Sequence, residues 1–450
     1  MQSLTRVLLA SPFLARQWRL SGSDAAEAPD WLAVAGVPVA RGHASTHVPP
    51  DCELLVYSDA VPADNVERHE AAKRKVSQLS YAQLLGQLMA ERTGIAIAGT
   101  HGKSTTAAMV AEILVAAGLD PTVIVGAAGL DGLPCARVGR GPHLLAEACE
   151  FRANFLHLAP QIAAVLNIEP DHFDCYPTTA ALEAAFARFI QQLPASGVLI
   201  ANADDATTRR LLELAPCRVE TVGLSHAADW RAVEVTHERG RYRFVLVHKG
   251  ERVTAVSLQV AGRHQVANAL AAAAVATVAG ASSVAVAEGL GRFAGLRRRL
   301  ENLGEPGGIA IVDDYAHHPT EIVAGLAAVR EMYPGRRLWA VFQPHQASRT
   351  THLLVEFAAS LQGADHVAVA EIYRAREGQP TADEATADDL ARETAALGVD
   401  VLPERRPSGI LETIHAAARP GDIVVTLGAG DIGNVAHAFV DRLRESCAVV

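Results

Sequence analysis

Gly94-Ile-Ala-Ile-Ala-Gly99-Thr-His-Gly102-Lys103-Ser104-Thr105-Thr106 is the stretch that decides the fold of this chain. Its apolar run predicts a buried strand, its glycines predict a tight turn, and the residues from about Thr105 onward predict a helix. Glycines let backbone N–H groups approach phosphate oxygens, and a helix N-terminus adds partial positive charge. The residues that we expect to bind nucleotide phosphates are Gly99, Thr100, His101, Gly102, Lys103, Ser104 and Thr105.

Two side chains of this loop have distinct expected roles. Lys103 would reach the terminal phosphates of ATP, and the Ser104 hydroxyl would help to hold Mg²⁺. Only Thr100 and His101 separate the first glycine from Gly-Lys, whereas the common phosphate loop has about four residues there. The alternative is an ordinary strand-to-helix turn that contains a lysine. The order of strand, Gly-x-x-Gly-Lys-Ser and helix favours the phosphate loop.

The rest of the chain alternates strands with helices on both sides of this loop. Alternation of this kind predicts parallel, doubly wound sheets in an α/β fold. We expect three blocks, at residues 1–92, 93–294 and 295–450. Besides the strand at 94–98, strands are expected at residues 18–21, 53–58, 143–146, 162–167, 197–201, 309–312, 338–342, 366–369 and 422–427, with a β meander at 231–258.

Composition limits the classes of function. A formal charge of −10 argues against a nucleic-acid partner, because phosphate backbones need a basic face. The sequence contains no run of 18 apolar residues, so no membrane-spanning helix is predicted. Six cysteines without a CxxC pair indicate reduced thiols and a cytoplasmic location. A signal peptide is the alternative for the apolar residues 7–15, but Arg16 and Arg19 follow at once and favour a folded segment.

Two further side chains are expected beside the phosphate loop. Glu147 follows the expected strand at 143–146, and His172 follows the strand at 162–167. Open α/β sheets bind ligands at the carboxyl ends of their strands, so both side chains are candidates to hold Mg²⁺ with Ser104. For either residue alone, a solvated surface group is the commoner interpretation.

Three later motifs gather polar or titratable side chains, and two of them also contain glycines. Asp313-Asp314-Tyr-Ala-His317-His318-Pro-Thr-Glu321 follows the strand at 309–312, where a structural metal site is one alternative. Gly262-Arg-His-Gln-Val-Ala-Asn268 opens an alanine-rich helix, where helix capping is the default explanation. Gly428-Ala-Gly430-Asp-Ile-Gly433 fits a dinucleotide fingerprint, but no second strand with an acidic end follows it.

The phosphate loop resembles the ATP loop of the Mur ligase family, and His101 is similar to the alanine-adding branch. Asn167-Ile-Glu-Pro-Asp-His-Phe-Asp174 and Phe342-Gln-Pro-His-Gln-Ala-Ser-Arg349-Thr are similar to further motifs of that branch, and Gly-Ala-Gly-Asp-Ile at 428–432 is similar to its closing motif. The resemblance implies an α/β, three-domain Mur ligase architecture. Its N- and C-terminal domains would be Rossmann-like, and its central domain a P-loop ATPase.

The resemblance also implies roles for individual residues. Glu147 and His172 would hold Mg²⁺ with Ser104, and His264 and Asn268 would recognise adenine. Asp314 would bind the nucleotide ribose. The residues expected to be catalytic are Lys103, His317 and Arg349. Those expected to bind the substrates are Asp24, His43, Ser58, His318 and Gln346. Departures from the family pattern include Cys149 in place of a carboxylate, Gln265 in place of an asparagine and Gln346 in place of an arginine.

The activity that the resemblance implies is ATP-dependent ligation in peptidoglycan precursor synthesis. L-Alanine would be joined to the carboxylate of UDP-N-acetylmuramate through an acyl phosphate, by a monomer or homodimer. Three alternatives stay open. They are a murein-peptide ligase that uses the same sugar, a simple P-loop phosphotransferase, and a non-catalytic relative that binds nucleotide.

One part of the family pattern has no counterpart here. The family opens with a strand and Gly-x-Gly-Gly-x-Gly-Met, whose backbone holds the UDP diphosphate, and Met1-Gln-Ser-Leu4 is similar to the part that begins at that methionine. We expect the natural start to lie upstream. Finding Met1 at the N-terminus of the native protein would contradict this expectation.

Overall fold

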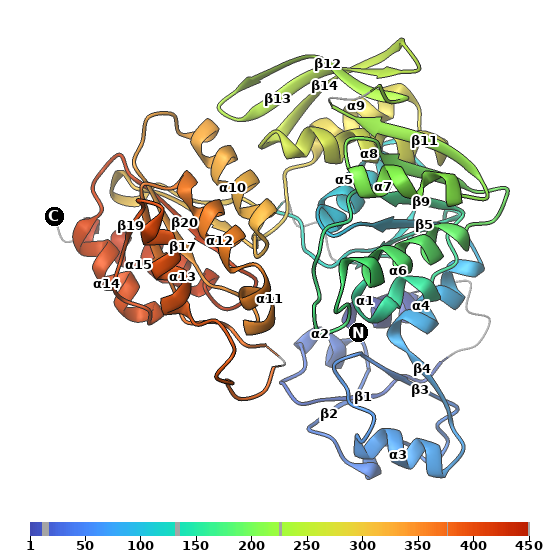
Figure 1. The fold of residues 1–450 in the computed structure, drawn as a ribbon. Coiled ribbons are helices and arrows are strands. Elements are labelled where there is room, and N and C mark those ends of the chain that lie inside the picture. The colour runs from blue at the N-terminus through green and yellow to red at the C-terminus, as the bar shows by residue number, and fades with distance from the viewer. Residues whose placement is uncertain (11–17, 131–135, 225–226, 376, 449–450) are drawn as a thin grey trace.

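The computed structural model describes residues 1–10, 18–130, 136–224, 227–375 and 377–448. Its elements fall into three groups along the chain, as Figure 1 shows. We call them the N-terminal region (α1 to α4), the central block (β5 to α9) and the C-terminal block (β15 to α15). No helix among these residues is long and apolar enough to cross a bilayer. The predicted three-part α/β arrangement is confirmed.

The N-terminal region contains two small parallel sheets, each with a helix between its strands. Strand β1 pairs with β2, and β3 pairs with β4. The elements are α1 (Gln2–Ala10), β1 (Gly22–Asp24), α2 (Asp30–Val34), β2 (Val39–Arg41), β3 (Leu54–Tyr57), α3 (Val66–Lys73), β4 (Ser77–Ser80) and α4 (Tyr81–Ala90). The expected strand at 18–21 is wrong, because the paired residues are Gly22–Asp24. Pro38 precedes the partner strand and has no N–H to extend the ladder.

The central block is built on a ten-stranded sheet in the order β14-β13-β12-β11-β10-β9-β5-β8-β6-β7. Strand β5 lies between β8 and β9 and is parallel to both. The ten strands of this sheet are β5 (Thr93–Ala98), β6 (Thr122–Ile124), β7 (Ala136–Arg137), β8 (His143–Ala148), β9 (Ile162–Val165), β10 (Val198–Asn202), β11 (Arg218–Gly223), β12 (Trp230–Glu238), β13 (Arg241–His248) and β14 (Glu251–Ala261). The last three form the expected β meander.

Both faces of the central sheet are covered. Ile95 and Ile97 of β5 face one core and Ala96 and Ala98 the other, as the alternation of strand side chains requires. The helices are α5 (Lys103–Ala116), α6 (Thr179–Gln191), α7 (Ala206–Leu211), α8 (His264–Val278) and α9 (Ser283–Arg292). Helices α5, α8 and α9 pack on the isoleucine face, whereas α4 and α6 pack on the alanine face.

The C-terminal block has a six-stranded sheet in the order β15-β16-β20-β17-β18-β19, parallel except for β15. Its elements are β15 (Glu301–Gly304), β16 (Ala310–Asp314), α10 (Pro319–Met332), β17 (Leu338–Phe342), α11 (Ala347–His352), α12 (Leu354–Ser360), β18 (His366–Val369), α13 (Ala387–Ala396), β19 (Asp400–Val401), α14 (Pro407–Ala417), β20 (Ile423–Leu427) and α15 (Gly433–Ala448). Helices α10, α12 and α13 cover one face, and α14 and α15 cover the other.

The glycine loop at 428–432 is filled by protein side chains. Arg298 donates to the carbonyl oxygens of Gly428 (2.7 Å) and Gly430 (3.0 Å), and its Nε bonds the buried Asp313 carboxylate at 3.2 Å. Gln343 donates to Asp431 and accepts from the backbone N–H of Ile432. These contacts give the loop a structural role in the C-terminal sheet.

Replacing Arg298 therefore should destabilise the C-terminal block. Arg298→Ala leaves two carbonyls without this donor and the buried Asp313 carboxylate without its cation, at a cost of about 2–4 kcal/mol. The free energy of opening is measured by hydrogen exchange at the amides of β16 and β20. The matched control is Arg297→Ala, whose exposed guanidinium pairs only loosely with Glu301 and should cost within about 0.5 kcal/mol. Equal effects of the two variants would contradict this account.

Candidate active site

The loop after β5 turns as the sequence predicts. Gly99 and Gly102 have φ angles of +143° and +80°, a region that L side chains rarely adopt. A Cβ at Gly102 would also lie 2.6 Å from Oδ1 of Asn268. The expected helix start near Thr105 is wrong by two residues, because left-handed Gly102 is the N-cap and α5 begins at Lys103.

Lys103 is held by its own loop and by a buried glutamate. Its Nζ donates to the carbonyl oxygens of Gly99 (2.5 Å) and Thr100 (3.0 Å) and to Oε1 of Glu150 (3.0 Å). The Glu150 side chain is only 2% exposed. Burial alone would lower the pKa of Lys103, but the charge of Glu150 outweighs burial and raises that pKa. The Lys103 ammonium group is therefore a positive charge held in a fixed position by the loop.

Ser104 and Glu147 meet beside Lys103, as expected. The Ser104 hydroxyl donates to Oε2 of Glu147 at 2.9 Å, and the N–H of Gly126 donates to the other carboxylate oxygen. Glu147 lies within β8 rather than after it, opposite Ile97 of β5. A hydroxyl and a carboxylate at the start of a phosphate-loop helix are oxygen ligands of the kind that Mg²⁺ prefers, so this pair fits the ion.

His172 is linked to the loop through Glu150. Its Nε2 lies 3.4 Å from Oε1 of Glu150, and its buried Nδ1 has no hydrogen-bond partner among the described residues. Burial would raise the pKa of Glu150, but Lys103 and His172 outweigh it and lower that pKa. An unpartnered imidazole nitrogen at this point is compatible with the expected ligand role of His172.

The segment after β9 fixes the other side of the loop. The N–H of His101 donates to Oδ1 of Asn167 at 2.7 Å, and the side-chain amide of Asn167 returns a bond to the His101 carbonyl. The hydroxyl of Thr100 accepts from the N–H of Glu169 and donates to its carbonyl. The loop and this segment therefore form one unit.

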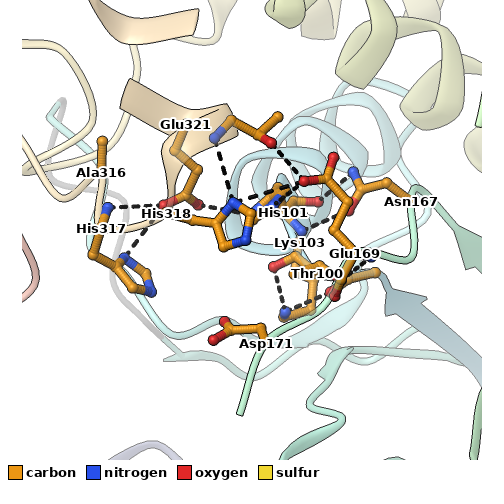
Figure 2. Close-up of polar contacts among 12 residues, drawn as sticks. Thr100, His101, Lys103, Asn167, Glu169, Asp171, Ala316, His317, His318 and Glu321 are labelled. Atoms are coloured by element: carbon orange, nitrogen blue, oxygen red, sulfur yellow. Dashed lines mark hydrogen bonds and ion pairs between the residues drawn. The ribbon is translucent and has the colours of Figure 1, made fainter. Parts of the chain in front are cut away.

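The His101 imidazole points toward the C-terminal block, between two carboxylates. Its Nδ1 lies 3.2 Å from Oε1 of Glu321 in α10, and its Nε2 lies 3.5 Å from Oε2 of Glu169 (Figure 2). The His318 ring lies 4.5 Å away, centroid to centroid. Burial lowers the pKa of His101, but Glu169 and Glu321 outweigh it and raise that pKa to about 9.

Glu321 also orients His317, the residue expected at the reacting centre. Its Oε2 accepts from the N–H of His317 at 3.0 Å, and Nδ1 of His317 lies 2.9 Å from the carbonyl oxygen of Tyr315. Burial lowers the pKa of His317 to about 3, so the ring is neutral near pH 7. Because Nδ1–H points at that carbonyl, Nε2 carries the lone pair. Figure 2 shows Glu321 reaching both histidines.

Arg349 forms a buried ion pair between the two blocks. Its Nε donates to Oδ1 of Asp171 at 2.7 Å, and both side chains are at most 5% exposed. Its Nη1 donates to the carbonyl oxygen of His345 at 3.1 Å. Burial would raise the pKa of Asp171, but Arg349 outweighs it and holds that pKa well below the usual range. The arginine is thus bound to the segment after β9, whose Glu169 bonds Thr100 of the phosphate loop.

Gln346 occupies an unusual backbone conformation at the same edge. It is buried with a φ of +71°, and its Nε2 has no hydrogen-bond partner among the described residues. Its backbone N–H donates to the carbonyl of Tyr373 at 2.9 Å. A buried donor without a partner is compatible with a ligand-binding role.

The residues expected around the base and ribose lie on either side of this junction. Asn268 of α8 lies beside Gly102 and accepts from the Thr106 hydroxyl at 3.4 Å. His264 is partly buried next to Gln265, and burial lowers its pKa to about 4. Asp314 lies at the end of β16 instead of after that strand, and burial raises its pKa to about 7.

The expected UDP-sugar residues lie in the N-terminal region. Nδ1 of His43 lies 3.1 Å from the Ser23 hydroxyl, and Glu67 accepts from Ser23 and from the N–H of Ala44. Asp24 and Ser58 accept from the nearby backbone N–H groups of Ala26 and Ala60. None of these contacts joins Asp24, His43 or Ser58 to the phosphate loop.

Sequence reasoning missed five carboxylates that organise these sites. They are Glu67, Glu150, Glu169, Asp171 and Glu321. Glu150, Glu169, Asp171 and Glu321 stand inside motifs whose other members were selected. The sequence signal that could have identified them is the position of acidic residues close to the expected phosphate-binding residues. A buried carboxylate needs a cationic partner, and such partners were expected there.

Comparisons with known proteins identify all three parts of the chain. Family models described as "Mur ligase family, catalytic domain", "Mur ligase middle domain" and "Mur ligase, glutamate ligase domain" match residues 9–93, 97–276 and 298–430. Relatives named UDP-N-acetylmuramate–L-alanine ligase occur in Salinibacter ruber and Chromobacterium violaceum. They are 39% and 41% identical to this chain, over 97% and 93% of it and 92% of each relative.

Solved structures agree with these relatives. A UDP-N-acetylmuramate–alanine ligase from Thermotoga maritima matches with a TM-score of 0.77 and 25% identity, over 95% of this chain and 93% of the other. A murein peptide ligase from Psychrobacter arcticus matches with a TM-score of 0.69 and 25% identity, over 94% and 93%.

The charges around His101 predict a pH dependence. The pKa of His101 is about 9 in the folded protein, above the usual value of about 6.5 for an imidazole. Protonated His101 therefore stabilises the folded state fully below about pH 6.5, and this stabilisation is lost as pH rises through about 9. We expect NMR of the imidazole in metal-free protein to show this titration, and Glu321→Gln to lower the pKa. Exposed Glu393→Gln is the control. Titration of His101 at or below pH 6.5 in the unmutated protein would contradict the arrangement.

Proposed function

Since the chain belongs to the Mur ligase family, we propose that it joins L-alanine to the carboxylate of UDP-N-acetylmuramate with consumption of ATP. The observation that carries this proposal is the meeting of the phosphate loop, the His317 loop and Arg349 at one junction, in a chain whose near-full-length relatives bear that name. The reaction belongs to peptidoglycan precursor synthesis, and we place it in the cytoplasm, in a monomer or homodimer.

The chemistry requires activation of a poor electrophile. Transfer of the γ-phosphoryl group of ATP to the sugar carboxylate forms an acyl phosphate and releases ADP. The amino group of L-alanine then attacks the carbonyl carbon, so that the amide forms, phosphate leaves and the amine loses a proton. Mg²⁺, when bound by Ser104, Glu147 and His172, would supply positive charge beside the phosphates.

Each candidate site residue has a proposed role in this reaction. The N–H groups from Gly99 to Thr105 bind phosphates, and Lys103 and Arg349 offset charge that develops during transfer. Neutral His317 accepts a hydrogen bond from the amine at Nε2. His264, Asn268 and Asp314 bind the nucleoside. The residues that we propose to bind sugar and amino acid are Asp24, His43, Ser58, His318 and Gln346.

The three parts of the chain have separate proposed tasks. Residues 1–92 would bind the UDP-sugar, residues 93–294 would bind ATP, and residues 295–450 would bring the amino acid to the junction. Pairs such as Arg349–Asp171 and His101–Glu321 support this division, because each joins the central block to the C-terminal block.

A murein peptide ligase is the second candidate function. The observations that favour it are the match to such a structure over most of both chains and Gln346 at the position of an arginine in the alanine-adding branch. An enzyme of this kind accepts a tripeptide in place of the single amino acid. The two candidates therefore differ only in the acceptor amine.

Phosphate release from Mg-ATP distinguishes these functions. We expect release that requires both UDP-N-acetylmuramate and L-alanine, because the acyl phosphate forms only on the sugar and is consumed only by the amine. The same assay with the tripeptide L-alanyl-γ-D-glutamyl-meso-diaminopimelate tests the second candidate. Consumption of ATP without amide product would indicate a simple phosphotransferase, whereas nucleotide binding without any release of phosphate would indicate a non-catalytic relative.

Replacing Lys103 tests the role of the loop. Lys103→Ala should lower kcat by a factor on the order of 10²–10³, since one preorganised charge at the transferring group is lost. The variant should keep its fold, checked by circular dichroism. Lys73→Ala, which removes a lysine that is 80% exposed, serves as the control. Unchanged kcat in Lys103→Ala would remove Lys103 from the mechanism.

A further inference from the structure

Three side chains from separate segments converge at the junction of the central and C-terminal blocks. His101 comes from the phosphate loop, Glu169 from the segment after β9, and His318 from the residue that caps α10. We call them the junction trio. One ligand atom from each lies within 4.8 Å of the other two. Oε2 of Glu169 lies 3.5 Å from Nε2 of His101 and 3.7 Å from Nδ1 of His318.

The contacts around the trio engage one ring nitrogen of each histidine and leave the other directed at Glu169. His101 directs Nδ1 at Glu321, while its Nε2 is buried and has no hydrogen-bond partner among the described residues. His318 directs Nε2 at the carbonyl oxygen of Pro170 (3.2 Å), and its Nδ1 receives only a long contact of 3.4 Å from the N–H of Thr320. Both remaining nitrogens therefore face the carboxylate of Glu169.

We propose that the junction trio binds a divalent transition-metal ion of the zinc class, separate from the Mg²⁺ site beside Ser104. Two imidazole nitrogens and one carboxylate oxygen form a donor set typical of Zn²⁺, whereas Mg²⁺ prefers oxygen ligands. Ligand atoms in a tetrahedral zinc site lie about 3.3 Å apart. Two of the observed separations exceed that value by only a few tenths of an ångström.

The surroundings of the trio supply the second layer that such sites need. Glu321 accepts from Nδ1 of His101, which fixes the ring and leaves Nε2 for the metal. The Thr320 hydroxyl donates to Oε2 of Glu169 at 2.5 Å, and Pro170 orients His318. A metal ion at this point takes the place of the second proton of the His101 imidazole.

The position of the trio gives the metal a defined effect. Its ligands would join the phosphate loop to the N-terminus of α10, in parallel with the contact between His101 and Glu321 (Figure 2). Metal binding should therefore hold the C-terminal block against the loop and raise thermal stability, because an ion that binds only the folded state stabilises it by mass action.

Calorimetric titration of the substrate-free full chain tests this proposal. In the presence of excess Mg²⁺ we expect one equivalent of Zn²⁺ to bind, and Co²⁺ to give the visible absorption of a four-coordinate complex. Glu169→Gln and His318→Ala should each abolish that binding. Glu321→Gln, which keeps the ligands and removes the orienting charge, should weaken it about 10- to 100-fold.

His352→Ala provides the matched control. His352 belongs to the C-terminal block and stacks on Phe173 of the segment that contains Glu169, at 4.3 Å between ring centroids, but it is outside the trio. This variant should bind Zn²⁺ like the unmutated chain. Stoichiometric binding that persists in Glu169→Gln or His318→Ala would overturn the proposal, as would no binding by the unmutated chain. Because no substrate is present, failure here leaves the proposed ligase activity untouched.

Discussion

Parallel strands bring their carboxyl ends to one edge of a sheet, and this constraint places every group at the junction. In the central sheet β5 lies between β8 and β9, so the phosphate loop, Glu147 and the segment from Asn167 to His172 share an edge. In the C-terminal sheet β16 and β17 flank β20; the loop after β16 carries His317, and helix α11, which follows β17, carries Arg349. The two edges meet through Arg349–Asp171 and His101–Glu321.

Ion pairs across that meeting decide geometry more than stability. Burying two charges costs about as much as their attraction returns, whereas removing one partner leaves a costly unpaired charge. Asp171 and Arg349 are both nearly inaccessible, so each strongly constrains where the other lies. Glu321 adds a second constraint because its two oxygens face histidines from different blocks. The blocks are therefore held in a specific orientation by a few matched charges.

Much of this arrangement could be predicted from local sequence signals. The strand and turn at Gly94–Gly102 were legible because apolar residues and glycines have strong local preferences. The strands 338–342 and 366–369 were predicted to the residue. The strand at 18–21 failed because pairing depends on a distant partner, and Pro38 limits that partner. Glu150 and Glu321 were missed for a related reason, because each depends on a distant partner. Glu150 pairs with Lys103, 47 residues away, and Glu321 contacts His101, which belongs to another block.

The charge balance of the junction bears on how a nucleotide can enter it. Each cation there already faces a carboxylate: Lys103 faces Glu150, Arg349 faces Asp171, and His101 faces Glu321. A triphosphate that approaches these nearly neutral pairs gains little net attraction and meets the nearby carboxylates. In the proposed function a divalent cation accompanies the nucleotide, and the Ser104–Glu147 pair presents oxygen ligands where that ion would supply positive charge. Lys103 would then exchange a carbonyl contact for a phosphate without leaving Glu150, which keeps the cation fixed throughout the exchange.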